Sequence, residues 1–155
     1  MAEEWLIDGY NLLHASASAR TSKPKRDLGP WLAELAGYAS LTKCTMLVVL
    51  DGAGDSGELE IHRTKFFSVV YSKKSSADAF IERRLFEHRS RTTFVVVTDD
   101  RAVTNIARGA GASVLGTRTF LEMMKETRKE SSDALHKDKI RSHGFHRPFE
   151  DKLKD

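Results

Sequence analysis

Short runs of apolar residues recur along the chain at the length of β-strands. They are rich in valine and aromatic residues and mostly do not alternate with polar residues, which is typical of strands buried on both faces of a sheet. These runs cover residues 5–7, 46–50, 66–71, 94–97 and 112–115. The pattern therefore predicts a sheet that is covered on both sides.

Segments with helical spacing separate most of these runs. Pro30 suits the first turn of a helix, and apolar residues recur at helical spacing through Ala39. Three further helices are expected over 77–85 (with Ser75 and Ser76 as candidate caps), over 103–109, and over 120–129 after Thr119. Because the strands alternate with helices, we predict an α/β fold with a parallel central sheet and helices on both faces.

Two segments lack a clear period. The glycine-rich segment 52–58 is expected to be a loop, and the residues just after it could add an edge strand. From Lys129 the helical pattern fades into a charged tail, in which Gly144 and Pro148 argue against a long continuing helix. We therefore expect one domain over 1–128 and a charged tail over 129–155 that is partly ordered at most.

The composition narrows the class of protein. A chain of 155 residues fits one domain, which buries about 70% of the surface of its unfolded chain. No apolar run approaches the ~20 residues of a membrane span, and the N-terminus has no basic region before an apolar stretch. A single cysteine, Cys44, excludes an intramolecular disulfide and a zinc site built from cysteines. We expect a cytoplasmic protein without a membrane segment.

The net charge of +3 permits nucleic-acid binding without requiring it. Its distribution is more informative, because residues 20–26 carry four basic side chains and no acid. This segment is a candidate contact for a polyanion.

Acidic residues gather at one predicted edge of the sheet. The carboxyl ends of parallel strands lie along the same edge, where ligands of open α/β sheets bind. A helix that follows a strand also begins at that edge, and two acids four residues apart on it share a face. The acids placed there by the pattern are Asp8, Asp51, Asp99 and Asp100 after strands, and Asp78 and Glu82 on a helix.

Carboxylates gathered in this way repel one another unless a cation neutralises them. Oxygen ligands without histidine or cysteine suit Mg²⁺ or Mn²⁺ rather than zinc, and such ions support in-line displacement at phosphorus. The alternative is that each acid only begins a loop or caps a helix, and Asp78 would suit a helix N-terminus on dipole grounds. The convergence of the whole set favours a metal site.

Other phosphate chemistries fit less well. The chain has no Gly-rich loop ending in Gly-Lys-Ser/Thr, and its Gly-Ala-Gly-Ala at 109–112 follows a helix instead of the first strand. A phosphatase with an aspartyl nucleophile would carry a second Asp two residues after the first, which neither Asp8 nor Asp51 has.

The acids lie in four short motifs, which are Asp8-Gly-Tyr-Asn11, Asp51-Gly52, Ser76-Ala-Asp78 with Glu82, and Thr98-Asp99-Asp100. In order and spacing these motifs resemble the YacP-like branch of the NYN nucleases, relatives of the PIN-domain ribonucleases. The resemblance covers residues 4–125, and Asp-Gly-Tyr-Asn is its most specific motif. It implies a metal-dependent endoribonuclease with a PIN-like three-layer sandwich around a mainly parallel sheet. YacP-like members in bacteria are associated with mRNA cleavage on the ribosome.

The resemblance also implies roles for individual residues. It implies the catalytic residues Asp8, Asn11, Asp78 and Asp100 and the metal ligands Asp8, Asp78, Asp99 and Asp100. Asp99 would compensate for the acid that the wider PIN pattern often carries at the position of Ala102. Supporting roles beside the ligands fall to Asp51, Glu82 and Thr98.

Basic residues near this edge are the candidate RNA contacts. They are Arg20, Lys23, Lys25, Arg26, Lys73, Lys74, Arg83 and Arg84. The alternative for the segment 20–26, and for the four basic residues around Asp78, is that they form a solvated surface without binding RNA.

We therefore expect an endoribonuclease that uses Mg²⁺ or Mn²⁺, with RNA, chiefly mRNA, and the ribosome as partners. One rival is a non-catalytic RNA- or ribosome-binding module of the same fold. The intact set of acids favours the enzyme, because carboxylates repel a polyanion and a site that only binds polyanions would not keep them. A small-molecule phosphohydrolase is a third reading, against which the open basic segment 20–26 counts.

Overall fold

The computed structural model describes residues 2–18 and 27–144 of the chain. The chain divides into two compact units, Met1–Leu121 and Glu122–Asp155. The first unit holds the sheet, its covering helices and the candidate site. No helix in the described ranges is long and apolar enough to cross a membrane.

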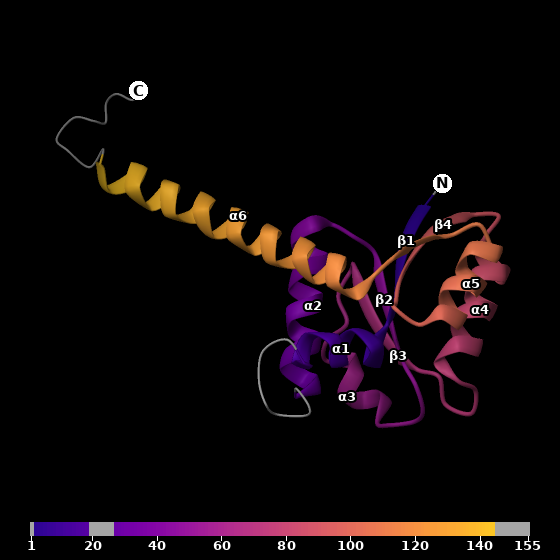
Figure 1. The fold of residues 1–155 in the computed structure, drawn as a ribbon. Coiled ribbons are helices and arrows are strands. Elements are labelled where there is room, and N and C mark those ends of the chain that lie inside the picture. Colours follow the sequence, from indigo (N-terminus) through magenta and orange to yellow (C-terminus); the bar gives the residue numbers. More distant parts are fainter. Residues whose placement is uncertain (1, 19–26, 145–155) are drawn as a thin grey trace. The chain divides into compact units, whose positions relative to one another are not determined.

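Five parallel strands form the central sheet of the first unit (Figure 1). They are β1 (Ala2–Asp8), β2 (Met46–Leu50), β3 (Phe67–Tyr71), β4 (Thr92–Val97) and β5 (Ser113–Leu115). Their order across the sheet is β3-β2-β1-β4-β5. The chain therefore builds outward from β1 to one edge, crosses back over the sheet, and continues on the other side of β1.

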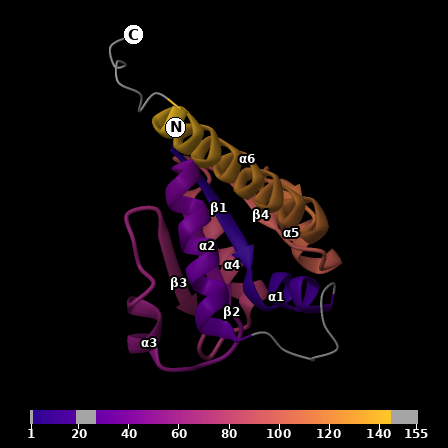
Figure 2. The ribbon, with the colours of Figure 1, turned by 90° about the vertical axis from the view of Figure 1, so that its left-hand side faces the viewer.

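Helices cover both faces of this sheet, as predicted. On one face lie α1 (Gly9–Ser18) and α2 (Leu28–Thr42), and on the other lie α4 (Ala77–His88) and α5 (Arg101–Gly109) (Figure 1). Figure 2 shows α2 running across its face of the sheet. The short helix α3 (Ser56–Glu60) contacts the edge strand β3. The result is the expected three-layer α/β sandwich.

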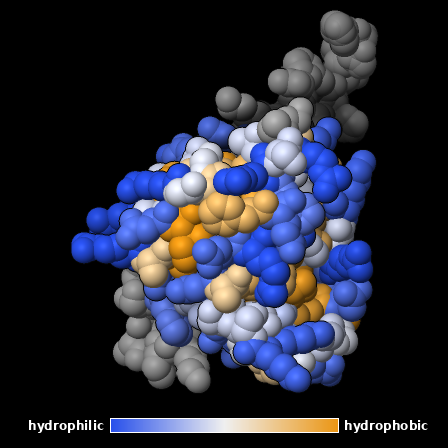
Figure 3. All heavy atoms as spheres, turned by 90° about the vertical axis from the view of Figure 1, so that its right-hand side faces the viewer, coloured by the Kyte–Doolittle hydropathy of each residue, from blue (hydrophilic) through white to orange (hydrophobic). Residues whose placement is uncertain are grey.

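The core on the α4 and α5 face explains why those two helices form. Ile81 and Leu85 of α4 and Val103 of α5 are completely buried against apolar side chains of the central strands. Ser76, one of the two predicted caps, accepts a hydrogen bond from the amide of Ala79 and so begins α4. Seen from this side, the surface is mainly hydrophilic, with apolar side chains gathered in small areas (Figure 3).

The opposite face buries the apolar stripe of α2. Trp31, Leu32 and Leu35 are almost fully buried there. The ring of Phe120, near the start of α6 (Thr117–Gly144), packs against Trp5 at 6.0 Å and Tyr38 at 5.6 Å between centroids. Phe120 thereby joins the first turns of α6 to the core of the first unit.

Two short helices differ from the sequence prediction. The expected single helix between the first two strands is two helices, because Leu12 and Leu13 bury a first one immediately after β1. The expected loop 52–58 contains the start of α3, which Asp55 caps by accepting a hydrogen bond of 2.8 Å from the amide of Gly57. The described residues after α3 form turns and no additional edge strand.

The C-terminal helix is longer than predicted. α6 continues through Lys129 to Gly144, whereas the fading period and Gly144 had argued against a long helix. Its residues beyond 129 have a weak amphipathic pattern, but the described part of the chain contains no proline there that would break the helix. Gly144 is the last residue of α6 and also the last residue of this range that the structure describes, so it does not interrupt the helix there.

Candidate active site

The candidate site lies where the direction of chain winding reverses, at the carboxyl ends of β1 and β4. These strands are neighbours, with Ile7 paired to Val97, so that Asp8 and Thr98 follow at adjacent positions. Ligands of open α/β sheets bind at such a switch point, because the connections leave in opposite directions and open a crevice. The strand order therefore selects Asp8 as the central acid of the edge.

Gly9 allows the chain to turn directly from β1 into α1. A Cβ atom on Gly9 would lie 2.6 Å from the Leu50 side chain and 2.8 Å from the carbonyl oxygen of Val49. Only glycine fits at this distance from the neighbouring strand. This close approach explains the Asp-Gly step of the first motif, and it places Asp8 at the base of α1.

Thr98 connects Asp8 to the loop after β4. Its hydroxyl donates a hydrogen bond of 2.9 Å to Oδ2 of Asp8 and accepts one of 3.0 Å from the amide of Asp100. Thr98 is 1% exposed and Asp8 is 9% exposed. The hydroxyl thus uses its single proton on the buried Asp8 and at the same time holds the backbone of Asp100, which is exposed.

Asp100 also caps the helix that follows it. Its Oδ1 accepts hydrogen bonds of 2.8 Å and 3.1 Å from the amides of Ala102 and Val103, at the start of α5. Capping an N-terminus is the ordinary reason for an Asp at this place. The cap uses Oδ1, and it orients the carboxylate at the sheet edge.

Asp78 and Asp51 meet at the beginning of α4. Asp78 lies in the first turn of α4, and Oδ1 of Asp51 accepts a hydrogen bond of 2.9 Å from the amide of Ala77. The second strand and the helix after the third strand are thereby joined at the same edge. Asp51 is exposed, whereas Asp78 is partly buried.

The loops after β2 and β3 are joined directly. The amide of Gly52 donates a hydrogen bond of 2.9 Å to Oγ of Ser72, and the amide of Lys73 donates one of 2.6 Å to the carbonyl oxygen of Gly52. Gly52 and Lys73 both have positive φ angles, 98° and 62°. These two contacts hold the Asp51 loop against the loop that leads to Asp78.

The electrostatics of the edge confirm that the acids converge. Burial raises the pKa of Asp8 to about 6, the Thr98 hydrogen bond opposes this rise, and the carboxylates of Asp78, Asp100 and Asp51 add to it. Burial also raises the pKa of Asp78, and Asp100 and Asp51 raise it further. Four of the six predicted acids therefore act on one another.

Asn11 and Asp99 lie beside this group but face other partners. Oδ1 of Asn11 accepts a hydrogen bond of 2.7 Å from the amide of Asp99, which ties α1 to the loop after β4. Both carboxylate oxygens of Asp99 contact Thr117 at the start of α6, Oδ1 through the backbone amide at 2.9 Å and Oδ2 through the hydroxyl. Asp99 does not act on the pKa of Asp8 or Asp78, so the structure separates it from the acids of the edge.

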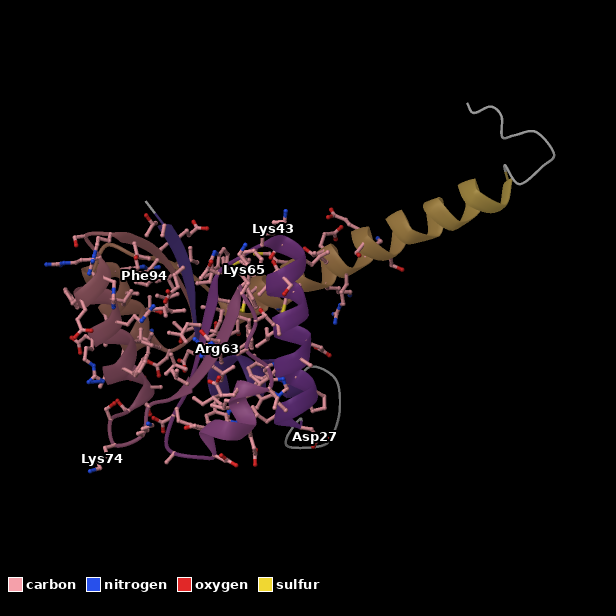
Figure 4. All side chains as sticks on the ribbon, turned by 180° about the vertical axis from the view of Figure 1, so that it is seen from behind. Asp27, Lys43, Arg63, Lys65, Lys74 and Phe94 are labelled. Atoms are coloured by element: carbon pink, nitrogen blue, oxygen red, sulfur yellow. The ribbon has the colours of Figure 1, made fainter. Side chains whose placement is uncertain are left out.

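Glu82 and the basic candidates lie around the site in different ways. Glu82 is exposed on α4 and is not among the carboxylates that raise the pKa of Asp8 or Asp78. Lys74 points outward from the loop between β3 and α4 (Figure 4). Arg83 is exposed on α4, whereas Arg84 forms a two-point contact with Glu4 at 2.7 Å and 2.8 Å. The predicted contacts Arg20, Lys23, Lys25 and Arg26 lie outside the described residues.

Two residues of the edge were not among the predicted site residues. Ser72 holds the Asp51 loop, and burial, followed by the influence of Tyr10, raises the pKa of Tyr71. Tyr71 ends the third strand, and its ring fills the space that a side chain on Gly54 would need. Their places at and just after the end of a strand were the available signal, but uncharged side chains there did not stand out.

The donor set of the site suits a hydrated divalent cation. Among the side chains that the structure describes, no group of three or more histidine, cysteine or acidic residues is arranged to hold one ion by itself. Mg²⁺ usually keeps several waters and binds through one or two carboxylates together with substrate phosphates. Ligation of this kind needs only one or two carboxylates from the protein, and Asp8, Asp78 and Asp100 are the candidates at this edge.

The chain is similar to a known protein family and to solved protein structures. The sequence pattern of the YacP-like NYN domain family matches residues 5–155. A mutant form of Rae1 (YacP) from Bacillus subtilis, solved by crystallography, is 21% identical with a TM-score of 0.70, covering 88% of this chain and 84% of that chain. Another crystal structure of Rae1 (YacP) from Bacillus subtilis is 22% identical with a TM-score of 0.68, covering 90% and 83%. No curated protein matches this chain.

Proposed function

Because the chain belongs to the YacP-like NYN domain family, and so to the PIN-like nuclease proteins, we propose that it is a metal-dependent endoribonuclease. It would hydrolyse phosphodiester bonds of RNA at the carboxyl edge of its sheet. The observation that carries the proposal is the buried Asp8, whose pKa of about 6 reflects burial and three neighbouring carboxylates. A protein tolerates such repulsion where a cation offsets it.

Asp8, Asp78 and Asp100 are the residues that would hold Mg²⁺ or Mn²⁺. The ion, when bound, would activate water and offset negative charge on the phosphodiester. Asp51 orients the first turn of α4 through Ala77, and Thr98 orients Asp8. Asp99 is left out of this set because both of its carboxylate oxygens contact Thr117.

RNA is the substrate that the family and the basic residues support. Lys73, Lys74 and Arg83 are exposed beside the acids and would contact the RNA backbone. We extend the proposal to mRNA as substrate, to the ribosome as partner and to the cytoplasm as location. The single cysteine is consistent with a reducing compartment. The basic segment 20–26 would add affinity for the polyanion.

The direct test is cleavage of labelled RNA by the purified protein with Mn²⁺, with Mg²⁺, and with a chelator. We expect cleavage that needs the metal in the parent and is lost in Asp8→Asn, Asp78→Asn and Asp100→Asn. Asp99→Asn is the matched control, because it lies next to Asp100, and its amide oxygen can still accept from the Thr117 amide. It should keep most of the activity.

The same assay separates the rival functions. Parental cleavage by Asp8→Asn would refute the proposed site. RNA binding without cleavage by the folded parent, under any of the metal conditions, would favour the non-catalytic binding module. Cleavage of small phosphoesters but not of RNA would favour the phosphohydrolase.

A further inference from the structure

A groove runs along the open edge of the sheet. Its floor is the edge strand β3, and its walls are α3 and α4. It consists of two adjoining hollows of about 490 Å³ and 290 Å³, which share Leu59, Glu60, Val69, Val70 and Phe80. β3 is the strand nearest the viewer in Figure 4, and Arg63 lies beside it.

One end of this groove lies at the loop that contacts the Asp51 loop of the candidate active site. The larger hollow is lined by Ser72 and Lys73, the same loop residues that contact Gly52. Gly52 directly follows Asp51, whose charge acts on Asp8 and Asp78. A strand with its scissile phosphate at the acids can therefore continue into the groove past Ser72.

The charges of the groove favour a polyanion at this end. At the far end Arg84 is paired with Glu4 at 2.7 Å, and Arg63 is paired with Glu60 at 3.4 Å, so these charges offset each other. Within the described part of the chain, neither Lys73 nor Arg83 forms an ion pair. The two cations without an ion pair therefore line the larger hollow, where a flanking phosphate would pass, while its carboxylate, Glu60, is paired with Arg63.

Phe80 supplies an apolar surface between these cations. It lines both hollows, and the guanidinium of Arg83 lies 5.8 Å from the centre of its ring. Arg83 also reaches back to within 3.5 Å of the Ser75 hydroxyl, in the loop that leads from the site. An aromatic ring beside an arginine is a typical platform on which a nucleobase stacks.

We propose that this groove binds the nucleotide of a single-stranded RNA that flanks the cleavage site. Its base would lie against Phe80, and its phosphates would contact Lys73 and Arg83. The larger hollow falls within the ~300–1,000 Å³ typical of small-ligand sites, which suits an unstacked nucleotide and not a duplex. This inference rests on the proposed function, because the groove is assigned to RNA through its connection with the acids.

The test measures the affinity of a short labelled single-stranded RNA in the presence of chelator, so that binding is observed without cleavage. The variants are Lys73→Asn, Arg83→Gln and Phe80→Leu. Asn tolerates the positive φ of position 73, and Leu keeps apolar volume at position 80 while removing the ring. Melting curves check that each variant folds.

A matched pair of residues on the same helix serves as the control. The guanidinium of Arg89 lies 4.8 Å from the centre of the Phe86 ring, yet neither residue lines the groove. Arg89→Gln and Phe86→Leu remove the same chemistry at the other end of α4. They should bind RNA as the parent does.

The expected results differ between the two kinds of contact. Lys73→Asn and Arg83→Gln should each lower the slope of log affinity against log salt by ~0.7, the value for one phosphate contact on a single strand. Phe80→Leu should weaken binding about tenfold and leave that slope unchanged, because stacking involves no counterion release.

If the groove variants bind RNA with the same affinity as the control variants, the inference is overturned. Metal-dependent cleavage of RNA by the parent would still support the proposed function in that case. Weaker binding confined to the groove variants, with no cleavage by the parent under any metal condition, would support the groove and refute the nuclease. A parent that binds no RNA would refute the groove. A mononucleotide that competes as strongly as the strand would overturn the assignment to a strand.

Discussion

The hydroxyl of Thr98 donates a hydrogen bond of 2.9 Å to Oδ2 of Asp8, although the two residues are 90 positions apart in the chain. The same oxygen accepts from the amide of Asp100. One buried side chain therefore orients Asp8 and the backbone of Asp100, and it is the contact that opposes the rise in the pKa of Asp8.

Replacing Thr98 with valine should raise the pKa of Asp8 above its value of about 6, because the opposing hydrogen bond is lost while burial and the neighbouring carboxylates remain. The acid side of the pH profile of cleavage should move to higher pH. The unfolding free energy should fall by ~1–3 kcal/mol, since the Asp100 amide loses its acceptor. The profile is measured as single-turnover cleavage across pH, and unfolding is measured with denaturant.

Thr98→Ser is the control for this prediction, because it keeps the hydroxyl and removes only a methyl group. Its pH profile should match that of the parent. Equal profiles for the serine and valine variants would show that the hydrogen bond does not control the charge of Asp8.

The stability of the metal-free protein should fall as the pH rises from about 4 to about 6. Over this range the folded protein keeps a proton on Asp8 that the unfolded chain has released, because the pKa is raised from 3.8 to about 6. Deprotonation then costs on the order of 3 kcal/mol at higher pH. Asp8→Asn removes this cost, so the variant should be more stable than the parent above pH 6.

Denaturant unfolding in chelator at several pH values measures this difference. Well below the unfolded pKa of 3.8 the parent and Asp8→Asn should have similar stabilities, since Asp8 is then neutral in both states. A stability difference that does not change with pH would contradict the assigned titration.

Mg²⁺ or Mn²⁺ should raise the melting temperature of the parent. An ion that binds only the folded state adds RT ln(1 + [L]/Kd) to the unfolding free energy, about 2.7 kcal/mol at a hundredfold excess over Kd. Asp8→Asn and Asp78→Asn should lose this increment, and Asp99→Asn should keep it, because Asp99 contacts Thr117. An equal rise in all four proteins would place the ions elsewhere.

Gly9→Ala should destabilise the protein by ~1–3 kcal/mol. The new methyl group would meet the Leu50 side chain at 2.6 Å and the Val49 carbonyl oxygen at 2.8 Å, so the strand and the start of α1 must move apart. Gly37→Ala is the matched control on α2, where a Cβ atom meets nothing within 4 Å and alanine should stabilise the helix by ~0.5–1 kcal/mol. Thermal unfolding of both variants gives the comparison.

Most of the architecture could be predicted from the chain alone because the central strands are buried on both faces. Runs such as Met46–Leu50, in which every residue is buried, leave a continuous apolar signal. The sequence did not predict α1 and α3 as separate helices, because a short helix has few positions at which apolar residues can repeat with helical spacing. α6 is longer than predicted because the apolar pattern fades after Lys129, whereas the helix continues to Gly144.

The sequence also predicted that the acids after strands and at the start of a helix lie at one edge, because a parallel sheet brings the carboxyl ends of its strands together. Which acids act together was decided by the tertiary structure. Asp99 and Asp100 are adjacent in sequence, yet Asp100 acts on Asp8 and caps α5, whereas Asp99 contacts Thr117. The pairing of β1 with β4 brings Thr98 beside Asp8, and burial there raises the pKa of Asp8. Strand order and desolvation arise from contacts between distant segments, so no local pattern encodes them.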